Sequence, residues 1–231
     1  MADMRTSEGE PGPRDPYVAE REAMVEHQMR RRGLSDERVL RAMATVPRHE
    51  FVPHASRSLA YADEPLGIGG GQTISQPFIV AAMTAALKLV GSERVLEVGA
   101  GCGYQSAVLA LLCREVYSVE LRPDLAQPAA DRLKRLGFEN VHVHCGDGSV
   151  GLKEFAPFDA ILVAAAAAAV PGPLLDQLSD GGRLIAPIGG EDQQQLILVT
   201  RREDQLTQER RELCRFVPLV GRHGWKPEEL L

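Results

Sequence analysis

The chain has 231 residues, and 26 Lys and Arg residues against 32 Asp and Glu residues give it a formal net charge of −6. This length, with a hydrophobic fraction of 44%, is typical of a one-domain globular protein. The acidic balance disfavours non-specific binding to nucleic acid, which depends on an excess of Lys and Arg, and no apolar run reaches the roughly 18 residues of a membrane span.

Residues 1–16 are rich in Gly, Pro and charge and contain no apolar segment. They predict a disordered tail and not a signal peptide. The four cysteines show neither C-x-x-C spacing nor a nearby pair of histidines: Cys102, Cys113, Cys145 and Cys214. We therefore expect no metal site and no disulfide framework, and a reducing cytoplasm is the expected location.

The first half of the chain predicts helices followed by a glycine-rich segment. Residues 17–32 indicate a helix that ends at Gly33, and Ser35 is expected to cap a second helix over residues 36–44. The segment 66–77 is dense in glycine and leads into a helix predicted over residues 78–89. A segment of this length and composition predicts a binding loop, with a plain connector as the alternative.

From residue 93 onward, short apolar runs alternate with helical patterns. Strands are predicted over residues 94–98, 116–120, 141–145, 158–163, 183–186 and 195–200, and helices over residues 104–112, 123–136 and 173–178. This alternation predicts an α/β fold with a doubly wound, mostly parallel sheet and helices on both faces. We expect a single domain over residues 17–231, in which residues 17–77 form an N-terminal helical cap and substrate loop and residues 78–225 form the core.

Acidic residues and glycines follow the first three strands of this predicted core. The first strand runs into residues 97–103 (EVGAGCG), Glu120 ends the second strand, and residues 146–148 (GDG) follow the third. Ligands of open α/β sheets lie at the carboxyl ends of the strands. Three acids around a glycine loop suit a ligand with hydroxyls, an adenine amine and positive charge, as in S-adenosylmethionine, and suit a pyrophosphate badly. The alternative is that each acid only caps the following helix.

These three segments resemble the cofactor motifs of class I S-adenosylmethionine-dependent methyltransferases. Further segments resemble one family within that class, the protein-L-isoaspartate O-methyltransferases: residues 46–53 (VPRHEFVP), 61–66 (YADEPL), 71–77 (GQTISQP) and 214–221 (CRFVPLVG). The likeness extends from about residue 24 to residue 225, and its most specific part is the QTISQP segment. It implies a Rossmann-like methyltransferase fold for residues 78–225.

The resemblance also implies a reaction. A methyl group would move from S-adenosylmethionine to the free carboxylate of an L-isoaspartyl residue in a damaged protein or peptide, with S-adenosylhomocysteine as the product. The methyl ester then closes to a succinimide, whose hydrolysis returns some normal aspartate. A carboxylate with a pKa of about 3.9 is already ionised at neutral pH, so no general base is required. The sequence indeed contains no Ser-His-Asp or Cys-His arrangement that predicts one.

By this resemblance Ser75 is the active-site serine, whose hydroxyl would bind the substrate carboxylate; the alternative is that Ser75 caps the helix that follows. His49 is expected to be a packing histidine, and Asp159 to support the edge of the sheet. The expected cofactor-binding residues come from the motifs and from one later strand: Thr73, Ile74, Glu97, Gly99, Gly101, Gly103, Glu120, Asp147, Gly148 and Gln195. The expected partners are isoaspartyl-containing proteins and peptides, with no nucleic acid and no membrane, and the expected state is a monomer.

Three alternatives stay open. Residues 164–169 are all alanine where this family commonly has a small or polar residue first, which leaves room for a methyltransferase of the same lineage acting on another carboxylate. A binding protein without catalysis is the second alternative, and the intact segment 72–77 argues against it. An NAD-dependent oxidoreductase is the third; the G-x-G-x-G spacing and the three acids disfavour it.

Overall fold

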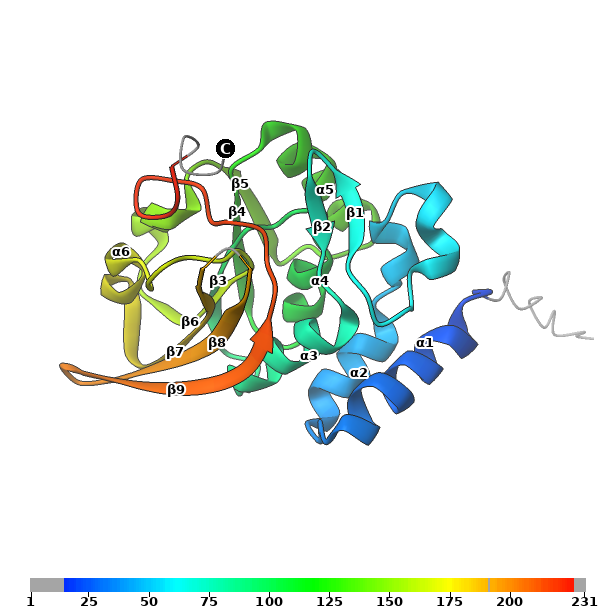
Figure 1. Cartoon of the computed structure of the whole chain (residues 1–231), viewed down its shortest axis with the longest axis horizontal. Coiled ribbons are helices and arrows are strands. Elements are labelled where there is room, and N and C mark those ends of the chain that lie inside the picture. Colours follow the sequence, from blue (N-terminus) through cyan, green and yellow to red (C-terminus); the bar gives the residue numbers. More distant parts are fainter. Residues whose placement is uncertain (1–14, 191, 227–231) are drawn as a thin grey trace, which may run out of the picture.

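The computed structural model describes residues 15–190 and 192–226. Its centre is a seven-stranded sheet with strand order β5-β4-β3-β6-β7-β8-β9 (Figure 1). The strands are β3 (Arg94–Val98), β4 (Glu115–Glu120), β5 (Val141–Cys145), β6 (Phe158–Val163), β7 (Leu178–Gly189), β8 (Gln194–Arg202) and β9 (Gln205–Cys214). The first five strands in this order run parallel, and β8 and β9 join them antiparallel. The predicted doubly wound, mostly parallel sheet is confirmed.

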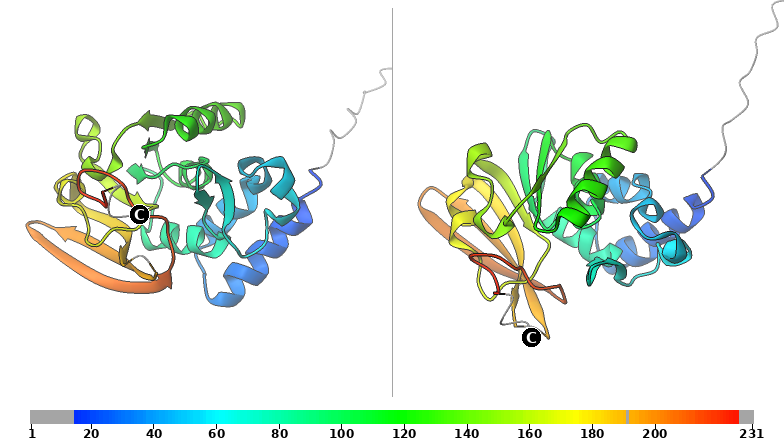
Figure 2. Two further views of the ribbon diagram at one scale, coloured as in Figure 1. Left: turned by 45° about the horizontal axis from the view of Figure 1, so that its top comes forward. Right: turned by 90° about the horizontal axis from the view of Figure 1, so that it is seen from above.

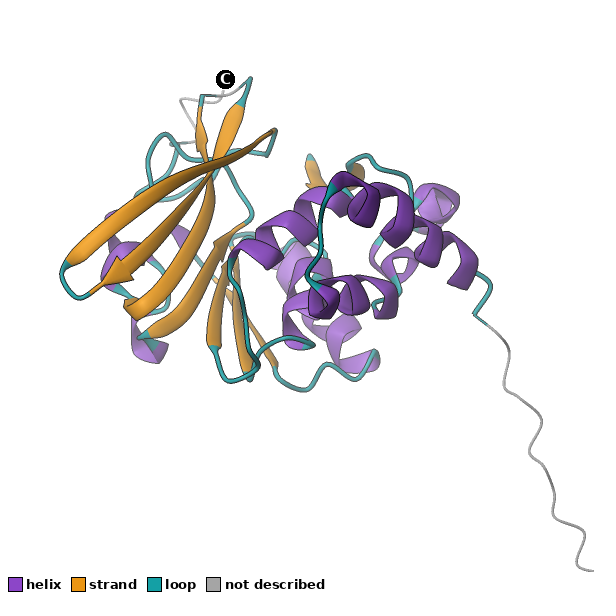
Figure 3. Cartoon of the chain, turned by 90° about the horizontal axis from the view of Figure 1, so that it is seen from below, coloured by secondary structure: helices purple, strands orange, loops and turns teal. Residues whose placement is uncertain are grey.

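Helices cover both faces of the sheet (Figure 3). The strand residues alternate between two clusters of buried side chains, since successive side chains of a strand point to opposite faces. Val95 and Leu162 belong to the cluster that contains side chains of α3 (Pro77–Ala86), α4 (Tyr104–Ala110) and α5 (Pro123–Arg135). Leu96 and Val163 belong to the cluster that contains Leu174 of the short α6 (Gly172–Asp176).

The N-terminal cap lies at the end of the molecule opposite the β8–β9 hairpin (Figures 1 and 2). The predicted first helix is present as α1 (Val18–Met24), a π-helical turn and a 3-10 turn, and it ends at Gly33 with a left-handed φ of 89°. The second helix is α2 (Glu37–Thr45). The sequence predicted Ser35 as the cap of this helix, but the cap is Asp36, whose carboxylate accepts the N–H groups of Arg38 and Val39. The predicted tail lies outside the described residues, except for its last two residues.

The glycine-rich segment forms a β-hairpin where the sequence predicted a loop. Strands β1 (Leu66–Gly69) and β2 (Gln72–Ile74) pair antiparallel, and Gly70 and Gly71 make the turn with φ values of 58° and 73°. A turn of this kind requires positive φ at both central positions, which glycine adopts without strain. The Arg122 guanidinium donates a hydrogen bond of 3.0 Å to the carbonyl of Gly70, which ties the turn to the end of β4.

Strand β9 was not predicted. All of its residues except Cys214 are exposed, so the sequence carries no alternation of buried and exposed positions there. Among the described residues, no helix is long and apolar enough to cross a bilayer.

Candidate active site

The loops at the carboxyl ends of β3, β4, β5 and β6 surround a cavity of about 280 Å3, which we call the large chamber. The β1–β2 hairpin and a C-terminal segment, residues 217–220, complete its wall. Its lining consists of Gln72, Thr73, Val98, Gly99, Gly101, Val119, Glu120, Leu121, Arg122, Gly148, Ala164, Ala165 and residues 217–220. This is the position at which open α/β sheets bind their ligands.

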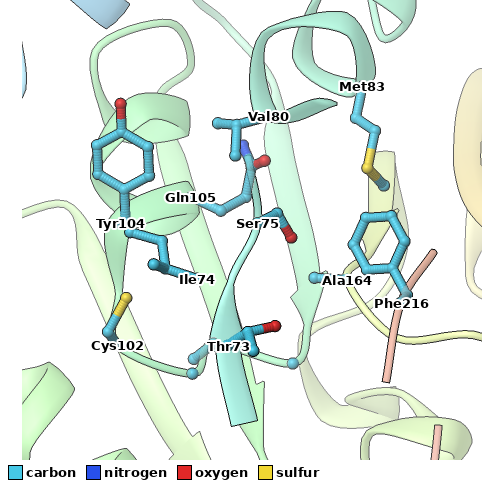
Figure 4. A pocket seen from close by; sticks show the side chains of 13 residues that line it. Thr73, Ile74, Ser75, Val80, Met83, Cys102, Tyr104, Gln105, Ala164 and Phe216 are labelled. Atoms are coloured by element: carbon cyan, nitrogen blue, oxygen red, sulfur yellow. The ribbon is translucent and has the colours of Figure 1, made fainter. Parts of the chain in front are cut away.

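Two smaller cavities adjoin the large chamber. The outer chamber, of about 90 Å3, is lined by Ser75, Gln76, Arg215, Phe216 and their neighbours. An inner cavity of about 40 Å3 lies between Ser75 and the glycine loop (Figure 4). Thr73 and Ala164 line all three cavities, so these two residues mark the junction between them.

The glycine loop brings backbone to the wall of the large chamber. Gly99, Gly101 and Gly103 have φ values of 92°, 54° and 89°, which side-chain-bearing residues rarely adopt. The Gly99 N–H donates to the carbonyl of Val119 at 2.8 Å. Gly103 forms the N-terminal boundary of α4, and a Cβ there would meet Leu133 at 3.1 Å. The loop therefore turns the chain sharply from β3 into α4 and leaves space beside Gly99 and Gly101.

Among the described residues, Glu120 presents the only carboxylate in the lining of the large chamber. Its side chain is buried, and its two oxygens accept the N–H groups of Gly101 at 2.8 Å and Arg122 at 3.0 Å. Each carboxylate oxygen can accept a second hydrogen bond. Glu120 thus orders the glycine loop and keeps acceptor capacity for the hydroxyls of a ligand.

Glu97 lies behind the chamber and outside its lining. It is fully buried on the α4 side of β3, where the hydroxyls of Ser106 and Ser118 donate to Oε2. Its Oε1 has no hydrogen-bond partner within the described part of the chain. Burial outweighs the two hydroxyl donors and raises the pKa of Glu97 from its ordinary 4.5 to about 7.

This pKa predicts a pH dependence of stability. Between about pH 4.5 and pH 7 the folded protein retains the Glu97 proton that the unfolded chain has released, so the free energy of unfolding falls as pH rises through that window. Relative to Glu97→Gln, we expect the wild type to lose about 2 kcal/mol between about pH 5 and pH 7.5. Urea unfolding of both proteins at the two pH values measures this loss. Equal losses in the two proteins would contradict the raised pKa.

Asp147 anchors the C-terminal segment. Its Oδ1 accepts the N–H and the hydroxyl of Ser149, and its Oδ2 accepts the N–H of Arg222 at 2.7 Å. The Ser149 hydroxyl in turn accepts the N–H of His223 at 2.9 Å. Burial alone would raise the pKa of Asp147, but these donors outweigh it and lower the pKa. Asp147 therefore holds the wall segment 217–220 in place from outside the chamber lining.

The structure brings most of the expected site residues together. Five of them line the large chamber: Thr73, Gly99, Gly101, Glu120 and Gly148. Ile74 and Ser75 line the inner cavity. Three support the walls from behind: Glu97, Gly103 and Asp147. Gln195 lies apart, because its amide donates to the carbonyl of Arg211 on β9 and it lines none of the three cavities.

Three further predictions concern His49, Asp159 and the possible capping role of Ser75. His49 is buried, bonded to the Tyr61 hydroxyl at 2.8 Å and stacked on Tyr17, which is a packing role. Asp159 accepts the N–H of Arg94 at the start of β3. Ser75 does not cap α3, whose N-cap is Gln76 without a side-chain bond, and the Ser75 hydroxyl makes no hydrogen bond to the described residues. In Figure 4, Thr73, Ser75, Ala164 and Phe216 surround the same space.

Sequence reasoning did not assign a role to several lining residues. Leu121, Arg122, Ala164 and the segment 217–220 were not among the expected site residues. The one available signal for the last of these was the ending CRFVPLVG, which resembles the family ending but carries no recognisable chemistry. Among residues 15–190 and 192–226, no group of three His, Cys, Asp or Glu residues could hold a metal ion.

The sheet, the glycine loop, and an acid at the end of the adjacent strand define a class I S-adenosylmethionine-dependent methyltransferase. Solved structures agree. A protein-L-isoaspartate O-methyltransferase is 32% identical, with a TM-score of 0.79 over 88% of this chain and 67% of that chain. A Plasmodium falciparum protein described as a protein-L-isoaspartate O-methyltransferase, solved with S-adenosyl-L-homocysteine, is 28% identical, with a TM-score of 0.73 over 87% of this chain and 98% of that chain.

Sequence comparisons give the family. The family model for protein-L-isoaspartate(D-aspartate) O-methyltransferase matches residues 19–224. A protein-L-isoaspartate O-methyltransferase of Roseiflexus castenholzii is 53% identical over 92% of this chain and 97% of its own length. One of Methanoculleus marisnigri is 51% identical over 93% of this chain and 97% of its own length. The chain belongs to the protein-L-isoaspartate(D-aspartate) O-methyltransferase family.

Proposed function

We propose that this enzyme transfers a methyl group from S-adenosylmethionine to the free carboxylate of L-isoaspartyl residues in damaged proteins and peptides. The observation that carries this proposal is the junction at Thr73 and Ala164, where the large chamber meets the outer chamber that contains Ser75. A cofactor in one chamber and a peptide carboxylate in the other would meet there. The comparisons do not favour the alternative, a methyltransferase of the same lineage acting on another carboxylate.

The large chamber has the chemistry that S-adenosylmethionine requires. Glu120 would accept hydrogen bonds from the ribose hydroxyls, and the apolar side chains of Val119, Leu121 and Leu219 would offer a surface to the adenine. The backbone of Gly99 and Gly101, which lines the chamber, would hold the amino-acid end of the cofactor. When bound, the cofactor supplies a methyl group activated by a sulfonium.

The remaining cofactor-site residues contribute to the walls. Gly148 has to be small, because a Cβ there would lie 2.6 Å from Val98 Cγ1. Thr73 and Ile74 flank the junction, while Glu97, Gly103 and Asp147 support the chamber wall from outside its lining. Gln195, which is bonded to β9, has no part in this proposal.

Ser75 acts on the substrate side as the catalytic residue. Its unengaged hydroxyl donates a hydrogen bond to one oxygen of the isoaspartyl carboxylate and turns the other oxygen toward the junction. The carboxylate is ionised at neutral pH, so the chain needs only to orient it and to exclude water. Phe216 and Ile79 provide apolar walls that exclude water, and the small side chain of Ala164 keeps the junction open.

Methyl transfer to paired peptides tests the reaction. The two peptides share one sequence and differ only in an isoaspartyl or an aspartyl linkage, and S-adenosylmethionine carries a labelled methyl group. We expect label on the isoaspartyl peptide alone. Label on both peptides, or on neither while S-adenosylhomocysteine still binds, would contradict the proposed substrate and favour another carboxylate.

Arg215 gives the outer chamber a positive charge. Within residues 15–190 and 192–226 it is the only charged residue of that lining and has no ion pair, and its side chain is exposed. We expect Arg215→Gln to raise the KM for an isoaspartyl peptide about fivefold at low ionic strength, with kcat nearly unchanged, because an exposed charge attracts the anionic peptide from solution. The difference in KM between Arg215→Gln and the wild type should become smaller in about 0.3 M salt. Arg210→Gln on β9, outside the cavities, is the control; an equal effect of both changes would contradict a local role.

The proposal extends to organisation and location. Buried side chains of the cap, such as Met43, share one cluster with core residues such as Val108, which supports a single domain over residues 17–231. Four free cysteines support a cytoplasmic location.

The net charge of −6 supports protein and peptide substrates without nucleic acid, and no membrane is part of the proposal. The enzyme acts as a monomer, a state that the charged outer strand β9 supports.

A further inference from the structure

Arg48 is a fully buried arginine close to the active site. Its guanidinium has no carboxylate partner in the described part of the chain, and backbone carbonyls receive its hydrogen bonds. Nε donates to the Ala60 carbonyl at 2.7 Å, and Nη2 donates to the Ser75 carbonyl at 2.8 Å. Nη1 is buried without a hydrogen-bond partner, and the guanidinium carbon lies 4.7 Å from the centre of the Tyr104 ring.

Burying a cation without a counter-charge is unfavourable for folding. An apolar side chain could fill the same volume without this penalty, so packing alone does not account for an arginine at this position. The planar guanidinium offers several donors in a fixed geometry, which lets it hold two carbonyls at once; a lysine ammonium lacks that fork. The two carbonyls belong to the cap, at Ala60, and to the segment between β2 and α3, at Ser75.

The Ser75 carbonyl belongs to the residue whose hydroxyl faces the outer and inner cavities. That hydroxyl makes no hydrogen bond to the described residues, so its position depends on the backbone that carries it. Ser75 lies between the end of β2 and the N-cap of α3, outside both elements. The hydrogen bond from Arg48 fixes the peptide group that leaves Ser75.

We propose that Arg48 is a positioning residue, which holds the backbone of Ser75 so that the Ser75 hydroxyl is directed at the substrate carboxylate. Arg48 itself lines none of the three cavities, so it would act on the substrate only through Ser75. The inference rests on the role proposed above for Ser75. Displacement of an orienting group by about 1 Å can reduce turnover by up to roughly 100-fold, so the loss of this anchor has a measurable effect.

A double-mutant cycle tests the inference with Arg48→Lys, which keeps a cation at the site, and with Arg48→Met. Each change is made in the wild type and in Ser75→Ala. In the wild type we expect Arg48→Lys to lower kcat/KM for the isoaspartyl peptide about 10-fold, while the Kd for S-adenosylhomocysteine stays within about twofold. In the Ser75→Ala background the same change should cost less than about twofold, because residues that act through one group are not additive.

Arg38→Lys is the matched control. Arg38 also donates to two backbone carbonyls, those of Leu89 and Leu112, but it lies outside the three cavities, and we expect its kinetics to stay at the wild-type level. If Arg48→Met fails to fold, the Arg48→Lys cycle carries the test. A 10-fold loss that persists in the Ser75→Ala background, or no loss in the wild type, would overturn the inference. If the Ser75→Ala variant alone methylated the peptide at the wild-type rate, the role of Ser75 in the proposed function would be refuted, and the inference with it.

Discussion

Replacement of Glu120 by alanine is expected to lower the affinity for S-adenosylhomocysteine by roughly 100-fold, because each hydrogen bond to a charged group contributes about 1.5–3 kcal/mol. Two effects combine in this change. The ligand loses an acceptor for its hydroxyls, and the N–H groups of Gly101 and Arg122 lose the carboxylate that orders the glycine loop. Isothermal titration calorimetry of the two proteins gives the ratio of their dissociation constants.

Glu115→Ala is the matched control for this measurement. Glu115 belongs to the same strand, but at its other end, where it pairs with His142 at 2.6 Å. Its removal should leave the affinity within about twofold, since exposed ion pairs contribute little. An unchanged affinity in Glu120→Ala would mean that the ligand does not occupy the large chamber in the way we propose.

Replacement of Ser75 by alanine is expected to lower kcat/KM for an isoaspartyl peptide roughly 30-fold, because the change removes a hydrogen bond to the substrate carboxylate, a charged acceptor. Affinity for S-adenosylhomocysteine should not change, since Ser75 does not line the large chamber. Steady-state methylation and ligand titration together separate the two quantities.

Ser179→Ala controls for the loss of a serine hydroxyl elsewhere. Ser179 lies near the start of β7 and donates to Asp159 at 3.4 Å, at the edge of the sheet opposite the chambers. Its kinetics should match those of the wild type. If Ser75→Ala weakened cofactor binding and peptide turnover by the same factor, the hydroxyl would belong to the cofactor site, and its assignment to the substrate would be wrong.

The buried part of the fold could be predicted from the sequence. The strands β3 and β6 agree with their predicted bounds because their apolar runs are short and flanked by turn residues. Strand β5 also agrees with its predicted bounds, although its residues are half-buried or exposed. Strand β9 was missed because exposure removes the pattern on which such predictions depend. The hairpin was taken for a loop, since glycines at positive φ are common to both.

Those residues of the candidate site that directly follow a strand could be predicted from the sequence. Glu120 and Gly99 lie at the carboxyl edge, as the rule for α/β sheets requires. The alternation of side chains along a strand could also have predicted the place of Glu97. Glu97 shares the strand face of Val95, which α4 covers, so its side chain packs against α4 and does not line the chamber. The wall segment 217–220 could not be placed, because only the tertiary fold brings this end of the chain beside β3 and β4.

Strand β9 has a consequence for an enzyme whose substrates are damaged chains. A substrate that is partly unfolded exposes strands, and an exposed strand can add to the open edge of another sheet. The outer strand of this sheet carries Glu209, Arg210, Arg211 and Glu212 in succession, and all four are exposed. An incoming strand would have to desolvate these charges before it could pair. The charged outer strand is therefore expected to disfavour pairing between this sheet and an unfolded segment of a substrate.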